Sequence, residues 1–242
     1  MEVKVVGCST SWTNRPTSCY CLDDKILIDC GEGTTKHFDV AKVDFVSINK
    51  IFITHFHNDH IGGITQFLCH NCQYSDIAKR KSLTIYGPVG LKKHLDMLKY
   101  FAFGEEEQKD INLEDYINIV EIDNESEIEF GDYVVKPYLL RHGKMRDVAY
   151  AFKKDGKVVG FSGDCTYDSN VERFAESCNL CFLVCCSEKT TPNHIGYDNF
   201  VQIKNKYKQN RYLAIHCVDR LYLNQDKFDI EFAENGKSYE CR

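Results

Sequence analysis

The feature that most constrains this chain is a dense run of metal-binding residue types placed directly after an apolar strand. Residues 51–53 form a short apolar run that predicts a buried strand, and residues 54–63 then read Thr-His-Phe-His-Asn-Asp-His-Ile-Gly-Gly. In an extended chain, residues two positions apart share one face, so His55 and His57 can converge on a single metal ion. Two more donors follow as the chain enters a predicted helix and turn toward a neighbouring point: Asp59 and His60.

Three imidazoles and one carboxylate within six residues are poor packing material. Neutral imidazole nitrogens and carboxylate oxygens are ligands that suit Zn²⁺ and similar first-row divalent ions. The alternative is a polar loop that contains histidines by chance, and that alternative accounts poorly for so dense a cluster. The run therefore predicts a metal site.

One such cluster cannot complete two metal sites, so further ligands must come from distant parts of the chain. Three candidates each follow directly after a predicted strand: His142, Asp164 and His216. A lone histidine at a strand end is more often a surface residue. Three such residues in a chain that already carries the cluster favour a role as ligands.

The remaining pattern alternates short strands with helices throughout the chain. Strands are predicted over 3–6, 18–22, 25–29, 83–86, 117–122, 128–130, 133–140, 148–152, 158–161, 180–185 and 212–215, and helices over 34–40, 61–72, 89–103, 169–176 and 198–207. Asp155-Gly156 predicts a hairpin between two of these strands. No repeat or linker divides the sequence, so we expect one domain, residues 1–242, of α/β class (α+β layered).

The charge balance excludes a dedicated, strongly basic nucleic-acid binder. Lys and Arg total 30 against 36 Asp and Glu, which gives a net charge of −6. Three basic runs are the local exceptions, and such runs are usually solvated faces, although they could contact a polyanion: residues 79–81, 92–93 and 204–208.

The thirteen cysteines indicate a reducing compartment. Their number is odd, and the charged residues near the N-terminus do not fit a signal peptide. No window resembles a membrane span, so we expect a cytoplasmic protein without membrane contact. Two C-x-x-C pairs, Cys69–Cys72 and Cys178–Cys181, lie too far apart for a zinc ribbon, and packing explains most of the cysteines first.

With these residues in view, the chain resembles the metallo-β-lactamase superfamily and, within it, the ribonuclease Z branch. Residues 54–63 resemble the superfamily's metal motif. Further segments resemble those of the branch: Ile-Asp-Cys-Gly-Glu-Gly-Thr at 28–34, residues 83–88, Arg141-His142 with Tyr150, residues 161–164, and the late histidines His194 and His216. The resemblance runs from about Val5 to Tyr222.

The resemblance implies a four-layer αββα sandwich with two divalent metal ions at one edge. His55, His57 and His142 would bind the first ion. Asp59, His60 and His216 would bind the second, with Asp164 bridging. Zn²⁺ is the expected metal, with Mn²⁺ or Fe²⁺ as alternatives. The resemblance also implies a homodimer.

These residues lead us to expect a metal-dependent phosphodiesterase. Two divalent cations offset by two aspartates and a hydroxide leave roughly one net positive charge, which attracts a phosphodiester in RNA or a nucleotide. Paired metals can supply a hydroxide near neutral pH and stabilise the attacking and leaving oxygens. Asp59 would orient or deprotonate the attacking water, and His194 would protonate the leaving oxygen. The alternative for His194 is an exposed loop residue.

Two departures from the ribonuclease Z pattern weigh against transfer-RNA 3′ processing. Only 21 residues separate His142 from Asp164, too few for that family's RNA-gripping arm. The family's supporting glutamate is also missing, because residues 185–187 read Cys-Cys-Ser. Glu188 could replace it only with a shift. Two further alternatives stay open: a hydrolase of a thioester, lactone or other carbonyl substrate, and a non-catalytic nucleotide- or RNA-binding module with a vestigial metal site.

Overall fold

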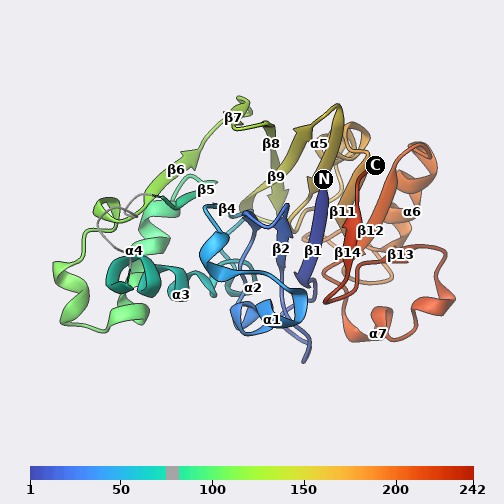
Figure 1. Cartoon of the computed structure of the whole chain (residues 1–242). Coiled ribbons are helices and arrows are strands. Elements are labelled where there is room, and N and C mark those ends of the chain that lie inside the picture. Colours follow the sequence, from blue (N-terminus) through green and yellow to red (C-terminus); the bar gives the residue numbers. More distant parts are fainter. Residues whose placement is uncertain (75–81) are drawn as a thin grey trace.

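The computed structural model describes residues 1–74 and 82–242, and it consists of two facing sheets with helices on their outer sides (Figure 1). The basic run at 79–81 lies outside the described residues. Each sheet has seven strands in the described part of the chain. Three buried clusters separate the layers: one between the sheets, and one between each sheet and its helices. The predicted αββα layering is confirmed.

The first sheet has the order β14-β1-β2-β3-β4-β5-β6. The strands from β3 to β6 run parallel, and β1, β2 and β14 join antiparallel. Their bounds are β1 (Glu2–Gly7), β2 (Cys19–Leu22), β3 (Ile26–Ile28), β4 (Lys50–Phe52), β5 (Thr84–Pro88), β6 (Asn118–Ile122) and β14 (Ser238–Glu240).

The second sheet has the order β13-β12-β11-β10-β9-β8-β7. Its strands are β7 (Ile128–Phe130), β8 (Tyr133–His142), β9 (Met145–Lys154), β10 (Lys157–Phe161), β11 (Leu180–Val184), β12 (Arg211–Ile215) and β13 (Glu231–Phe232). The predicted hairpin is confirmed, because Asp155 and Gly156 join β9 to β10 with φ of 50° and 72°. Such a pair of positive φ values matches the twist of the flanking strands. β9 and β10 occupy most of the sequence between His142 and Asp164, where no long arm is present.

The helices divide between the two outer faces. α1 (Phe38–Ala41), α2 (Asn58–Ile61), α3 (Ile64–Cys69) and α4 (Leu91–Phe103) belong to the first half, and α5 (Ser169–Ser177), α6 (Tyr197–Lys206) and α7 (Asp219–Tyr222) belong to the second. Short 3-10 turns cover Thr34–His37, Phe45–Ser47, Glu107–Asp110, Leu113–Asp115 and Gln225–Lys227, and a π turn covers His70–Tyr74. No helix of the described residues has the length and apolarity that crossing a membrane requires.

Aromatic rings fill the layer between the sheets and fix how the two halves meet. Phe161 of β10 stacks on Phe182 of β11, with ring centroids 5.0 Å apart and an interplanar angle of 8°. Tyr20 of the opposite sheet contacts both rings at centroid distances of 5.4 Å. All three side chains are almost completely buried. This packing holds the ends of strands from both sheets at one edge of the sandwich.

We expect Phe161→Ala to lower the free energy of unfolding by roughly 3–5 kcal/mol, because it leaves a cavity between the sheets. Chemical denaturation monitored by circular dichroism measures the change. Phe101→Ala is the matched control: its ring on α4 is 76% exposed, so its loss should change stability by no more than about 0.5 kcal/mol. Equal stability of the two variants would contradict the described core.

Candidate metal centre

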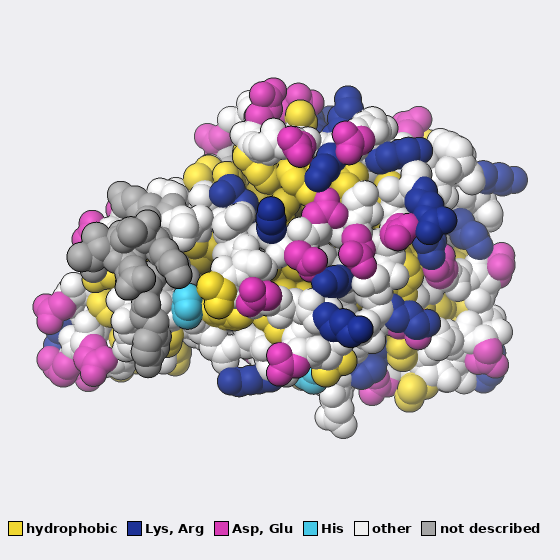
Figure 2. Space-filling view, viewed as in Figure 1, with side chains coloured by type: hydrophobic (Ala, Val, Ile, Leu, Met, Phe, Trp, Pro, Cys, Tyr) yellow, Lys and Arg dark blue, Asp and Glu magenta, His cyan; other side chains and the backbone are white. Residues whose placement is uncertain are grey.

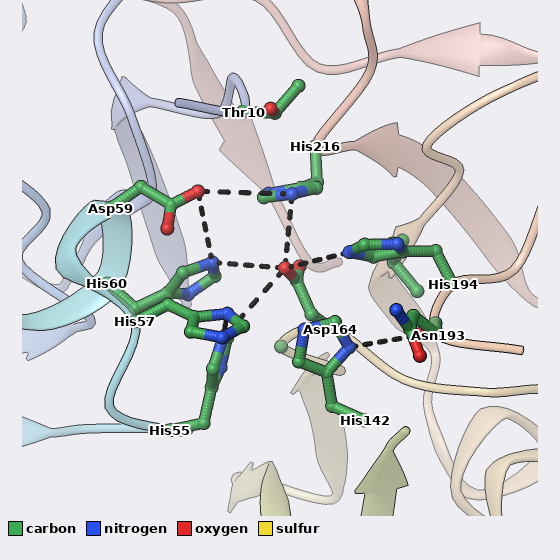
Figure 3. A network of polar contacts seen from close by, with 12 residues as sticks. Thr10, His55, His57, Asp59, His60, His142, Asp164, Asn193, His194 and His216 are labelled. Carbon is green, nitrogen blue, oxygen red and sulfur yellow. Dashed lines mark hydrogen bonds and ion pairs between the residues drawn. The ribbon is translucent and has the colours of Figure 1, made fainter. Parts of the chain in front are cut away.

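The candidate metal centre lies where strands of both sheets end. The run 53–60 follows β4, His142 ends β8, Asp164 lies three residues after β10, and His216 follows β12. Strands β10, β11 and β12 are parallel, as are β3 and β4, so the carboxyl ends within each group point to one edge. Figure 3 shows the side chains from these separate elements converging on one point.

Left-handed backbone turns aim several of these strand ends into the site. Asp29, Gly163 and His216 each follow closely after a strand and have φ between 55° and 59°. Such values cost of order 1–3 kcal/mol in a non-glycine residue and persist only where the surroundings fix them. The His216 amide donates to the Cys8 carbonyl at 2.7 Å, and the Asp29 amide donates to the Phe52 carbonyl at 2.9 Å. The backbone is thus held while the side chain turns inward.

Gly163 is required by space as well as by φ. A Cβ atom at this position would lie 2.4 Å from an oxygen of Asp147 and 2.7 Å from Cβ of Thr54. The missing side chain lets the chain after β10 pass directly beneath the histidine run. Asp164 follows directly, and the glycine before it explains how the carboxylate at this strand end reaches the centre.

All seven predicted ligands are brought together. They fall into one group of His55, His57, His142 and Asp164 and another of Asp59, His60 and His216, and a third group of Cys186, His194 and His216 shares His216 with the second. Within each group the candidate ligand atoms all lie within 4.8 Å of one another. The geometry meets the requirement for two adjacent cation sites, and the assignment as metal ligands stays a prediction.

The Asp164 carboxylate lies between the two groups. Its Oδ2 atom is 3.1 Å from His216 Nε2 and 3.4 Å from His60 Nε2. The same oxygen is 3.9 Å from His55 Nε2, on the side of the other group. Figure 3 shows this oxygen at the centre of the network. This is the position that a carboxylate shared by two cations would occupy.

Three histidines have their outer nitrogen held from behind, which orients the inner nitrogen toward the centre. His142 Nδ1 donates to the backbone carbonyl of Asn193 at 2.8 Å. His60 Nδ1 lies 2.7 Å from a carboxylate oxygen of Asp29, and His55 Nδ1 lies 3.1 Å from Thr54 Oγ1, with an oxygen of Asp147 at 3.3 Å. Metal-binding histidines are oriented in this way, because the partner fixes the tautomer and leaves Nε2 free to coordinate.

The site buries more negative charge than its side chains neutralise. Asp29, Asp59 and Asp164 are buried, whereas no Lys or Arg of the described residues is buried. Asp147 is buried as well, but burial raises the pKa of its carboxyl well above the ordinary value and favours its neutral form. Removing carboxylates from water is costly unless cations accompany them. The Oδ1 atom of Asp164 is buried and has no hydrogen-bond partner. Divalent cations fit this arrangement, since they would supply both the missing charge and a partner for that oxygen.

The pKa values of the histidines favour the neutral form that binds metals. Burial lowers the pKa of His55 well below its ordinary value and lowers that of His142, and it brings the pKa of His216 to about 4. His60 is the exception: burial opposes its charge, but Asp164 and Asp29 raise its pKa well above the ordinary value.

Burial also disfavours the ionised form of Asp164, but the neighbouring His216 and His60 hold the pKa of this carboxyl well below its usual range. The carboxyl at the centre is therefore ionised. An ionised carboxylate is the form that a shared metal ligand requires.

His194 lies at the rim of this centre, and its predicted role as a proton donor stays a prediction. Its Nε2 is 3.3 Å from the Asp164 carboxylate, and its side chain is 22% exposed. The adjacent Asn193 holds His142, so one loop both supports a candidate ligand and presents His194. Glu188 points elsewhere and pairs with Arg220 at 3.2 Å, so it does not replace the missing supporting glutamate.

Sequence reasoning missed several supporting residues. Asp29 was noted only within the segment 28–34 that resembles the ribonuclease Z branch, and no role was predicted for it. It follows a buried strand, which is the same signal that identified the other strand-end residues. Asp147 is an acidic residue at the start of an apolar stretch of β9, which was a usable signal. Asn193 supplies a backbone carbonyl, so no side-chain pattern could identify it. Neither C-x-x-C pair belongs to a group of metal-binding side chains in the part of the chain that the structure describes.

A family model, that of the anti-Pycsar protein Apyc1, matches residues 11–239. Ribonuclease Z of Pyrococcus horikoshii is 33% identical over 141 residues, which is 57% of this chain and 41% of that protein. The chain thus matches less than half the length of this relative.

Two solved structures share the fold across nearly the whole chain. Human tRNase Z, short form (ELAC1), superposes with a TM-score of 0.76 at 20% identity and 100% coverage of both chains. The metallo-β-lactamase fold protein YhfI of Bacillus subtilis gives a TM-score of 0.74 at 17% identity, with 98% coverage of both chains. The fold of the present chain is therefore the metallo-β-lactamase fold, as the sequence resemblance implied.

We expect Asp29→Asn to weaken Zn²⁺ binding about 10- to 100-fold, because a neutral amide orients the His60 ring less strongly than a carboxylate. Competition with a chromogenic chelator measures the affinity. Asp39→Asn, at an exposed position on α1, is the matched control and should leave it unchanged. Unaltered affinity in a correctly folded Asp29→Asn protein would contradict the orienting role.

Proposed function

The chain belongs to the family of the anti-Pycsar protein Apyc1, and from this premise we propose that it is a dinuclear metal-dependent phosphodiesterase. One observation carries the proposal: the Asp164 carboxylate lies between two groups of imidazole and carboxylate donors. A shared carboxylate flanked by two such groups is an arrangement suited to the hydrolysis of phosphate esters. The whole chain, residues 1–242, would form this one catalytic domain.

His55, His57 and His142 would hold one metal ion, and Asp59, His60 and His216 the other, with Asp164 between them. The imidazole-rich donor set favours Zn²⁺, with Mn²⁺ or Fe²⁺ as alternatives. When bound, two such ions would lower the pKa of a water and neutralise charge on the phosphoryl oxygens.

Asp59 would orient the attacking water and accept its proton. One carboxylate oxygen is 3.9 Å from both His60 Nε2 and His216 Nε2, and the Ser11 amide donates to it at 3.3 Å. These contacts fix the carboxylate at the border of the second group, where its oxygens face the centre.

His194 would protonate the leaving oxygen. Its imidazole is partly exposed, whereas the candidate metal ligands other than the exposed His57 are buried. Asp164 and His194 share a contact at 3.3 Å, which keeps the ring turned toward the centre. A general acid in this position would contribute on the order of 10²–10⁴-fold to the rate.

A small nucleotide diester fits the surroundings better than a long RNA. The cavity above the centre has a volume of ≈ 320 Å³, which is near the small end of the range for small-molecule pockets, about 300–1,000 Å³. Three lysines of the described basic runs are paired with acids: Lys92 with Glu114, Lys204 with Asp229 and Lys206 with Glu172. On the face in Figure 2, basic and acidic side chains are interspersed rather than gathered in one stripe.

We also propose that the protein is cytoplasmic and forms a homodimer. All thirteen cysteines are free thiols, which is consistent with a reducing, cytoplasmic environment. We propose a homodimer in solution, which light scattering coupled to size-exclusion chromatography tests directly. A monomeric mass would remove the dimer from the proposal and leave the chemistry of the centre unaffected.

The purified protein should hydrolyse bis-p-nitrophenyl phosphate and small nucleotide diesters, including cyclic ones, in proportion to its bound metal. A chelator should abolish the activity, and added Zn²⁺ or Mn²⁺ should restore it. The same sample, with metal quantified, should leave thioesters, lactones and 3′-extended transfer-RNA precursor uncleaved. Preference for a carbonyl substrate would contradict the proposal, and diesterase activity that survives Asp164→Ala would contradict the bridging role.

His194→Ala should lower kcat about 10²–10⁴-fold on an alkyl diester, whose leaving oxygen needs a proton. It should lower kcat much less on bis-p-nitrophenyl phosphate, because p-nitrophenolate leaves without protonation. Steady-state kinetics on the two substrates measures the difference. Equal losses on both would show that His194 serves the structure of the site rather than proton transfer.

A further inference from the structure

The single tryptophan of the chain stands exposed at the mouth of the candidate metal centre. Trp12 lines the same cavity as His57, Asp59 and His194, and 89% of its surface is exposed. No aromatic ring or cation of the described residues contacts its ring. A fully hydrated indole forgoes the stabilisation that its large apolar area would gain on burial. Such a side chain beside a catalytic centre is typical of a binding surface.

The backbone beneath Trp12 is fixed although the ring is free. The Trp12 amide donates to Thr10 Oγ1 at 3.3 Å, within the β1–β2 connection that extends below the sheets in Figure 1. Ser11, immediately before it, donates its amide to the Asp59 carboxylate at 3.3 Å. The loop backbone is therefore attached to Asp59 itself, which holds the base of the Trp12 side chain close to the centre.

The other end of this loop is anchored to the second half of the chain. Arg15 donates to the Cys217 carbonyl at 2.9 Å and pairs with Asp219 at 3.1 Å. Its guanidinium lies 3.8 Å from the centroid of the Tyr222 ring. Both ends of the loop are thus fixed at the sheet edge that holds the centre. Because the loop is already ordered in the free protein, binding a ligand there costs less conformational entropy.

We infer that Trp12 is a stacking platform for the base of a nucleotide substrate whose phosphodiester lies between the two ligand groups. The inference rests on the proposed function, which places the phosphate. The ring offers a flat, rigid face with few rotatable bonds, and stacking on it accepts any base. Arg15 on the same loop is held by Asp219 and Tyr222 and is not free to take this role. Trp12 is therefore a specificity residue for base-bearing over base-free diesters.

Fluorescence tests binding without turnover, because Trp12 is the only tryptophan. Titration of the metal-loaded protein with a nucleoside 5′-monophosphate should quench its emission with saturation. Ribose 5-phosphate, which lacks the base, should not quench, even where it competes for the site. Absence of quenching by a nucleotide shown to bind by calorimetry would overturn the inference. A concentration-dependent blue shift without any nucleotide effect would also overturn it, since a second copy of the chain would then cover the ring.

Kinetics tests specificity. Trp12→Ala should raise KM for a nucleotide diester about 5- to 100-fold with little change in kcat. It should leave KM and kcat for a base-free sugar diester unchanged. Trp12→Phe should retain most of the affinity, whereas Trp12→Leu, without a π-face, should not. Phe101→Ala, which removes an exposed ring from α4, is the control and should leave KM and kcat unchanged for both substrates.

The outcomes separate this inference from the function on which it rests. Diester hydrolysis with equal effects of Trp12→Ala on both substrates would overturn the stacking role and leave the phosphodiesterase proposal in place. Base-dependent quenching in a protein that cleaves no diester would overturn the phosphodiesterase proposal and support nucleotide recognition by Trp12.

Discussion

The Asp164 carboxylate, buried between imidazoles from four separate parts of the chain, is the group on which the rest of the site depends. Its Oδ2 atom contacts His60, His194 and His216 at 3.1–3.4 Å, while its Oδ1 atom has no partner. An ionised carboxylate at this depth requires positive charge close by. The histidines around it are held from behind, His142 by the backbone carbonyl of Asn193, His60 by Asp29 and His55 by Thr54.

The sandwich brings this centre together because strands of both sheets end at the same edge. Left-handed turns at Asp29, Gly163 and His216 direct the chain inward there. Each of them is costly or sterically restricted, and all of them lie at the centre, which is where strained backbone is expected to concentrate. Aromatic packing of Phe161 against Phe182 and Tyr20 holds the two sheets in the relation that the centre needs.

Much of this was predictable from the sequence, for identifiable reasons. The histidine run was recognisable because metal-binding residue types are so dense in it. His142, Asp164 and His216 were recognisable because each follows an apolar strand. The helix predicted over 61–72 was wrong in extent: α2 ends at Ile61, α3 covers Ile64–Cys69 after Gly62 and Gly63, and a π turn follows at His70–Tyr74. Strands β13 and β14 and helix α7 are too short to carry a periodic signal. The exposed Trp12 and the carbonyl of Asn193 depend on tertiary placement, which no local pattern records.

The central claim is that two metal ions flank Asp164. Anomalous diffraction from crystals of the protein purified without chelators, collected above and below the zinc absorption edge, tests it most directly. Two peaks are predicted, one within the group of His55, His57 and His142 and one within that of Asp59, His60 and His216, with Asp164 contacting both. No peak, or a single peak on one side of Asp164 in a crystal grown with excess Zn²⁺, would contradict the account.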